Sequence, residues 1–167
     1  MLKILHDAWE VDIVQLAAVY EQSNREAGRQ NSRSRDRNAQ LLIGEQLFYE
    51  YVLYFLEDPN SLYAVWTEKG QYVSALRLEP FEDGLLLNGL ETRPEHRCKG
   101  YATMLVKAVQ GYLSDLGSCK LYSHVDRMNE ASFALHKSCG FSLLLDYAVF
   151  LDGSKHTDAV TLIFKVN

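Results

Sequence analysis

The sequence of 167 residues lacks long apolar runs, internal repeats and proline-rich linkers. A membrane-spanning helix needs about 18 or more consecutive apolar residues. The longest apolar stretch here, Phe48 to Leu56, is interrupted by Glu50. The first residues also become acidic, at Asp7, too early for a secretory signal. We therefore expect a cytoplasmic protein that does not insert into membranes.

Cysteine is scarce as well, with only Cys98, Cys119 and Cys139 in the chain. Their wide spacing does not fit the close pairs of a zinc site, and three thiols cannot form a closed set of disulfides. We expect individually placed, reduced thiols and no metal site. The formal net charge of −5 also argues against a nucleic-acid binder, whose domain is usually basic.

Length and patterning indicate one domain over residues 1–167, because 47% of the residues are apolar and 23% are charged. Alternating segments predict strands, and apolar positions at helical spacing predict helices. The strands are expected at 2–5, 61–67, 72–78, 85–92, 120–125, 141–151 and 157–165, and the helices at 9–22, 41–55, 99–116 and 129–138. Asp7 is a candidate cap for the first helix. This order predicts an α/β (α+β) fold, with a mixed sheet of about seven strands and four helices on its faces.

The turn between the fourth strand and the third helix carries the chemistry. A helix that begins directly after a strand presents unpaired backbone N–H groups, and its dipole favours an anion there. Gly100 permits close backbone approach, and Arg97 and Lys99 add positive charge. Neither a Walker loop nor a dinucleotide fingerprint fits the spacing of the glycines. The turn is either a phosphate-binding device or a tight connection with solvated basic side chains.

Two motifs resemble those of the GNAT acyltransferase superfamily. The first is Arg97-x-x-Gly100-x-Ala102, preceded by a strand that ends at Leu90-x-Thr92-x-Pro94. The second is Asn129-x-x-Ser132-x-x-Leu135-His136, followed by Gly140-Phe141. Their order and spacing leave room for one helix and one strand between them, as in the family. The order of the expected strands also matches the family along nearly the whole chain. The resemblance implies the GNAT fold, with a largely antiparallel sheet, and N-acetyltransferase activity.

The resemblance also implies acetyl-CoA, or another short acyl-CoA, as the donor. The backbone amides of residues 97–102 would hold the CoA pyrophosphate, and strand 90–92 would pair with the pantetheine arm. A local bulge would splay that strand from strand 121–125, and the thioester would lie in the gap. Asn129 would either touch the pantetheine or cap its helix. The expected donor-site residues are Leu90, Glu91, Thr92, Arg97, Cys98, Lys99, Gly100, Tyr101, Ala102 and Asn129.

Acyl transfer to an amine needs a base, an oxyanion donor and a proton for the thiolate. A backbone N–H between Leu90 and Thr92 is the natural oxyanion donor. Glu91 is the candidate base, although strict alternation turns it away from the face of its neighbours unless a bulge intervenes. The alternative is that Glu91 is structural or exposed. Asn88 cannot act as a base but can orient a water.

Many family members carry a tyrosine where this sequence has His136. Histidine titrates near neutral pH, so the position suggests His136 as the general acid for the leaving thiolate. His124 and Asp126 lie at the end of the expected strand 120–125. They would either reach the acceptor site or be simply exposed. Cys139 is expected to pack in the core.

Charge is distributed unevenly along the chain. Five arginines and two acids between Ser23 and Asn38 make that segment +3, which leaves −8 for the rest. We expect a polar loop there, bordering the acceptor site. It would bind an acceptor carboxylate or phosphate, or the CoA 3′-phosphate, or be merely solvated. The acidic remainder suits a polyamine or aminoglycoside instead, so the sequence leaves the acceptor open as a small-molecule or peptide amine.

Two other functions also fit the sequence. One is an acyl-CoA-binding module that has lost catalysis, because the tyrosine is missing from the second motif. Another is an RNA-interaction protein that uses the arginines, which the lack of aromatic stacking residues in that segment disfavours. A homodimer is an open alternative to a monomer.

Overall fold

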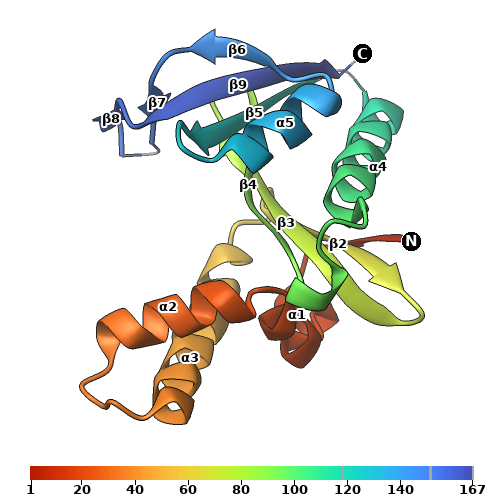
Figure 1. Ribbon diagram of the computed structural model, residues 1–167. Helices are drawn as coiled ribbons and strands as arrows, with labels where there is room; N and C mark the ends of the chain where they lie inside the picture. Colours follow the sequence, from red (N-terminus) through yellow and green to blue (C-terminus); the bar gives the residue numbers. More distant parts are fainter. Residues whose placement is uncertain (118, 151, 167) are drawn as a thin grey trace.

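The computed structural model describes residues 1–117, 119–150 and 152–166. Seven strands form one sheet in the order β1-β2-β3-β4-β5-β9-β6 (Figure 1). Only β4 and β5 run parallel to each other, and every other neighbouring pair is antiparallel. The strands are β1 (Leu2–Leu5), β2 (Leu62–Glu68), β3 (Gln71–Phe81), β4 (Gly84–Thr92), β5 (Cys119–Asp126), β6 (Ser142–Leu145) and β9 (Ala159–Val166). The mixed, largely antiparallel sheet of seven strands is therefore confirmed.

The pair Lys69-Gly70 between the second and third expected strands predicts a hairpin, which the structure confirms between β2 and β3. Lys69 and Gly70 both have positive φ angles, 48° and 81°. Two such residues in succession give a turn whose twist matches the strands that it joins.

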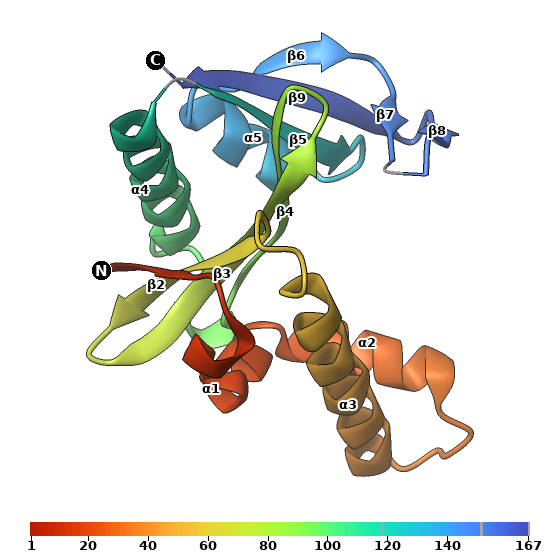
Figure 2. The same cartoon turned by 180° about the vertical axis from the view of Figure 1, so that it is seen from behind.

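Helices cover both faces of the sheet (Figures 1 and 2). They are α1 (Ile13–Val19), α2 (Glu21–Asn31), α3 (Arg37–Phe55), α4 (Tyr101–Leu116) and α5 (Glu130–Ser138). One apolar core lies between the sheet and α4, and includes Leu76, Leu105 and Leu121. A second core, on the opposite face, joins α1 and α3 to β2 through Leu16, Val52 and Tyr63. None of the helices in the described ranges combines the length and apolarity needed to cross a bilayer.

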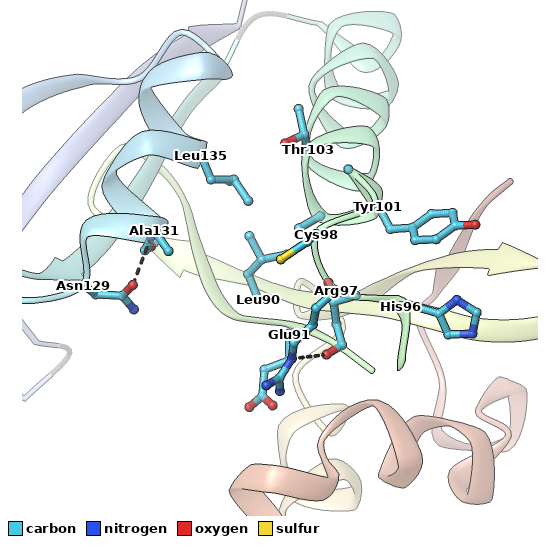
Figure 3. A pocket seen from close by; sticks show the side chains of 14 residues that line it. Leu90, Glu91, His96, Arg97, Cys98, Tyr101, Thr103, Asn129, Ala131 and Leu135 are labelled. Carbon is cyan, nitrogen blue, oxygen red and sulfur yellow. Dashed lines mark hydrogen bonds between the residues drawn. The ribbon is translucent and has the colours of Figure 1, made fainter. Parts of the chain in front are cut away.

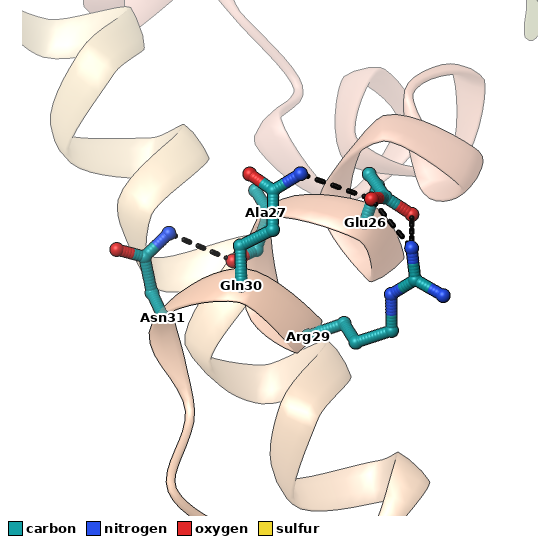
Figure 4. A network of polar contacts seen from close by, with 5 residues as sticks. All are labelled: Glu26, Ala27, Arg29, Gln30 and Asn31. Carbon is teal, nitrogen blue, oxygen red and sulfur yellow. Dashed lines mark hydrogen bonds and ion pairs between the residues drawn. The ribbon is translucent and has the colours of Figure 1, made fainter.

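The prediction of four helices was wrong by one, because most of the arginine-rich segment is helix α2 rather than a loop. Arg25 pairs with Glu21 at 2.6 Å and Arg29 with Glu26 at 2.7 Å, each along the same helix face. Figure 4 shows further polar contacts that also join residues three or four positions apart within α2. These pairs stabilise a polar helix that apolar periodicity alone does not reveal.

Two other segments differ from the prediction. The helix expected at 9–22 is a short 3₁₀ turn, Ala8–Glu10, followed by α1, and Asp12 rather than Asp7 caps α1 by accepting a hydrogen bond from Gln15 N–H. The strand expected at 141–151 divides into β6 and β7 (Ala148–Val149), and Leu151 lies outside the described residues. β7 forms a small separate hairpin with β8 (Lys155–His156).

Candidate active site

The site is built around an irregularity in β4. Between Ala75 and Arg77 on β3 lies one residue, whereas two residues, Gly89 and Leu90, lie between their partners on β4. This is a β-bulge, and Gly89 adopts a φ of +57° that favours glycine. The predicted bulge is confirmed.

Beyond the bulge, β4 and β5 no longer pair. Their parallel register covers only Leu85 to Leu87 on β4 and Leu121 to Ser123 on β5. Both strands continue past this stretch, so they diverge and leave the end of β4 without a neighbour on that side. The predicted splay of the two strands is also confirmed.

The turn after β4 presents a row of free backbone donors. Cys98 and Gly100 have φ angles of +58° and +81°, and α4 begins at Tyr101 with no side-chain cap. In the described chain, no hydrogen bond involves the backbone N–H groups of residues 98–103. Successive N–H groups around left-handed residues and a helix N-terminus form a concave anion site. A Cβ at Gly100 would meet nothing within 4 Å, so the space in front of the turn is open.

These parts enclose one pocket of about 560 Å³, bounded by β4, the turn, α4 and α5 (Figure 3). It brings together all but one of the expected donor-site residues. They are Leu90, Glu91, Thr92, Arg97, Cys98, Gly100, Tyr101, Ala102 and Asn129. The exception is Lys99, whose ammonium group donates instead to the carbonyl of Glu95 at 2.8 Å.

Helix α5 supplies the opposite wall of the pocket. Asn129 caps α5 by accepting a hydrogen bond from Ser132 N–H at 3.0 Å, and its side chain also lines the pocket. The cap is therefore observed, and the contact with pantetheine stays a prediction. The expected set did not include His96, Thr103, Ala131, Ser132 and Leu135, which also line the pocket. Helical spacing from Asn129 to Ser132 and Leu135 was the available signal for two of them.

Glu91 lies where the pocket meets helix α2. Its carboxylate accepts a hydrogen bond from the Ser23 hydroxyl. It also lines a groove with Gln22, Glu26 and Arg97. Burial raises the pKa of Glu91, while the Ser23 hydroxyl and the nearby Arg97 and Arg77 partly oppose this shift. A carboxyl group of raised pKa at a pocket edge is suited to proton transfer near neutral pH.

His136 lies in the core rather than in the pocket. Its side chain is 2% exposed and packs edge-on against Phe141. Its Nδ1–H donates to the carbonyl of Ser132 at 2.8 Å, and Nε2 has no hydrogen-bond partner in the part of the chain that the structure describes. Burial lowers the pKa of His136, so the ring is neutral near pH 7. Its role as general acid stays a prediction, and this placement disfavours it.

The other candidates have simpler surroundings. His124 is half-buried between Phe81 and Phe150, and burial lowers its pKa. Asp126 is exposed and accepts a hydrogen bond from Met128 N–H. Cys139 is buried in the core, as expected. Across residues 1–117, 119–150 and 152–166, no three His, Cys, Asp or Glu side chains gather so as to hold a metal ion.

A comparison with protein families identifies the family to which the chain belongs. A profile described as the acetyltransferase (GNAT) family matches residues 17–141. The chain belongs to this family. Membership in the GNAT family indicates an acyl-CoA-dependent acetyltransferase. No curated protein sequence matches the chain.

Solved GNAT structures share the fold. The ribosomal-protein-S18-alanine N-acetyltransferase from Escherichia coli has a TM-score of 0.64 at 19% identity, over 100% of this chain and 95% of that one. The PaiA N-acetyltransferase from Thermoplasma acidophilum, in complex with coenzyme A, has a TM-score of 0.65 at 14% identity, over 99% of both chains. A phosphinothricin acetyltransferase from Sinorhizobium meliloti, in complex with AcCoA, has a TM-score of 0.64 at 18% identity, over 100% and 88% of the two chains.

Proposed function

We propose that this GNAT protein transfers an acetyl group from acetyl-CoA to the primary amine of a small molecule or peptide. The observation that carries the proposal is the joining of three features in one pocket. These are the open end of β4, the free amides at the start of α4, and a carboxyl group of raised pKa.

The donor is recognised by backbone groups in this proposal. The free N–H groups of residues 98–103 hold the pyrophosphate. The guanidinium of Arg97, which donates to the Thr92 carbonyl at 3.0 Å, adds positive charge to the pocket near Glu91. The unpaired end of β4 offers backbone groups to the amides of the pantetheine arm. Leu90 and Leu135 line the apolar part of the pocket. Coenzyme A in the related PaiA structure and AcCoA in the phosphinothricin acetyltransferase support this assignment.

The chemistry proposed for the site uses few side chains. Glu91 accepts a proton from the amine, directly or through a water, and the free amine attacks the thioester carbon. The N–H of Leu90 donates to the carbonyl oxygen as negative charge develops there. The new C–N bond replaces the C–S bond, the nitrogen releases its remaining extra proton to water, and CoA leaves as the thiolate.

A thiol-release assay with acetyl-CoA tests the proposal. The panel of acceptors is amino acids, peptides, polyamines and aminoglycosides. We expect release of CoA with at least one class, and a loss of about 10²-fold or more in kcat for Glu91→Gln, as for removal of a general base. Half-buried Glu79→Gln on the neighbouring strand β3 is the control for lost negative charge. Tight binding of CoA with no thiol release from any acceptor would instead favour a binding module that has lost catalysis.

A further inference from the structure

Tyr20 lies between α1 and α2, far in sequence from the site that it touches. Its side chain is 5% exposed, and its hydroxyl donates to the carbonyl of Gly89 at 2.6 Å. Gly89 and Leu90 are the two residues of the bulge, and neither has a registered partner in β3 or β5. The Tyr20 hydroxyl therefore donates a hydrogen bond to a carbonyl at the position where the pairing of β4 with β3 becomes irregular.

The hydrogen bond from Tyr20 to the Gly89 carbonyl fixes the direction of the Leu90 N–H group. The described chain contains no cis peptide bond, and in a trans peptide the C=O of one residue and the N–H of the next point in opposite directions. Tyr20 belongs to the core that β2 shares with α1 and α3. Leu90 packs against the core on the α4 face and lines the donor pocket. With the Gly89 carbonyl held towards Tyr20, the N–H of Leu90 points towards the pocket.

Tyr20 is itself held in place. Its ring packs against Phe48, with 5.0 Å between centroids, and meets Tyr63 edge-on at 6.3 Å. The Arg77 guanidinium backs Gly89 closely, since a Cβ at Gly89 would lie 2.9 Å from its Nε. Burial raises the pKa of Tyr20, so its hydroxyl remains a proton donor.

We infer that Tyr20 is a positioning residue for acyl transfer, because its bond to the Gly89 carbonyl aims the Leu90 N–H at the thioester carbonyl oxygen. The inference rests on the proposed function. An oxyanion donor acts through its orientation before the charge develops, so a donor in a bulge needs an external constraint. Tyr20 supplies this constraint from a different element and does not touch the substrate.

The carbonyl stretch of bound [1-¹³C]acetyl-CoA, measured by isotope-edited infrared spectroscopy on the full chain, tests this role without an acceptor. A hydrogen bond to the carbonyl lowers its stretching frequency. We expect a lowered frequency in the wild-type complex and a return towards the free-ligand value in Tyr20→Phe. The Kd for acetyl-CoA should change by less than about threefold, because the pyrophosphate and pantetheine contacts remain. A buried tyrosine with a purely structural role would not move the frequency.

Tyr63→Phe is the matched control. It removes a hydroxyl from the same aromatic cluster, but the Tyr63 hydroxyl has no hydrogen-bond partner among the described residues and makes no hydrogen bond to Gly89. The carbonyl frequency should stay at the wild-type value in this variant. Phe48→Leu loosens the packing of Tyr20 while keeping its hydroxyl, and should raise the frequency part of the way. This second variant keeps the test available if Tyr20→Phe does not fold.

The outcomes separate the inference from the proposed function. If the wild-type chain binds no acetyl-CoA, the proposed function fails. If it binds acetyl-CoA with an unshifted carbonyl, or if folded Tyr20→Phe or Phe48→Leu keeps the wild-type frequency, the inference alone is overturned. Once an acceptor is found, Tyr20→Phe should lower kcat by about tenfold, a fraction of the loss for removing a whole oxyanion donor, and leave KM for acetyl-CoA unchanged.

Discussion

Glu91 and His136 show how burial acts on two titratable residues of this protein. Burial raises the pKa of the carboxyl group and lowers that of the imidazole, since it disfavours the charged form of each. For Glu91, which reaches both the pocket and the α2 groove, this shift favours proton transfer near neutral pH. For His136, which is sealed in the core, the same physics keeps the ring uncharged.

Ser23→Ala should move the pH profile of the reaction. The Ser23 hydroxyl lowers the pKa of Glu91 by stabilising the carboxylate, so its removal raises that pKa further. The acid limb of log kcat/KM against pH should then shift to higher pH, because more alkaline solution is needed to ionise Glu91. Gln22→Ala serves as the control, since Gln22 lines the same groove and has no hydrogen bond to Glu91. A profile identical to wild type would contradict Glu91 as the base.

His136 should make the fold sensitive to acid. In the unfolded chain a histidine has a pKa of about 6.5, and burial lowers the pKa of His136 in the fold. As the pH drops, the unfolded chain therefore takes up a proton at this histidine before the folded chain does. The free energy of unfolding falls from about pH 6.5 down to the pKa of His136 in the fold. His136→Phe, which keeps a ring against Phe141, should make the urea-unfolding free energy less dependent on pH in this range. The exposed His6→Gln is the control, and an unchanged slope in His136→Phe would contradict the prediction.

Among the elements, α2 and α3 depend on a close crossing, and α2 contacts β4 through the hydrogen bond from Ser23 to Glu91. A Cβ at Gly28 would lie 1.8 Å from the Gln40 carbonyl oxygen, and one at Gly44 would lie 1.8 Å from the Asn24 carbonyl oxygen. Both contacts are with backbone, so a side chain cannot be accommodated by a rotamer change. The two glycines thus set the distance between the helices.

Gly28→Ala and Gly44→Ala should each destabilise the protein by about 2 kcal/mol or more, because the helices must separate. Urea denaturation measures the loss. Gly111→Ala is a matched helical control, since a Cβ there meets nothing within 4 Å. It should be neutral or stabilise the fold by up to about 1 kcal/mol. Equal stability of all three variants would show that the crossing tolerates side chains.

Elements with a strong local pattern were predicted well from sequence. The β2–β3 hairpin has its turn residues in place, and α4 and α5 lie within two residues of the expected bounds. Helix α2 was missed because its stability comes from ion pairs and the glycine crossing rather than from an apolar stripe. The break between β6 and β7 was missed because an alternating segment does not reveal where its partner strand ends.

At the scale of the whole molecule, charge is arranged differently from what the segment total suggested. Arg25 and Arg29 are paired within α2, whereas Arg33, Arg35 and Arg37 are exposed and have no ion pair within the described ranges. Arg37 lines a groove with Gln22 and Glu26, and these two residues also line the groove that reaches Glu91. Arg37, one of these unpaired arginines, therefore lies along one approach to the candidate base.

Replacing Arg33, Arg35 and Arg37 together by serine should raise KM several-fold for an acceptor that bears a carboxylate or phosphate. KM for acetyl-CoA should stay unchanged, and the effect should shrink at high salt because exposed charges are screened. Arg25→Ser with Arg29→Ser is the control, since these arginines are already paired. Steady-state kinetics over the acceptor panel make the measurement. If KM is unchanged for every substrate, these arginines do not contribute to acceptor binding.

The sequence by itself determined the layout of this protein. Motif spacing and alternation identified the GNAT resemblance, the strand–turn–helix unit around Gly100, and most residues of the pocket, because these features depend on neighbours a few positions apart. Only the tertiary structure decided the directions of side chains and peptide groups. It buried His136, brought Ser23 to Glu91, and set Tyr20 against Gly89 across 69 residues. Such contacts depend on how distant elements pack against an irregular strand, which no local pattern encodes.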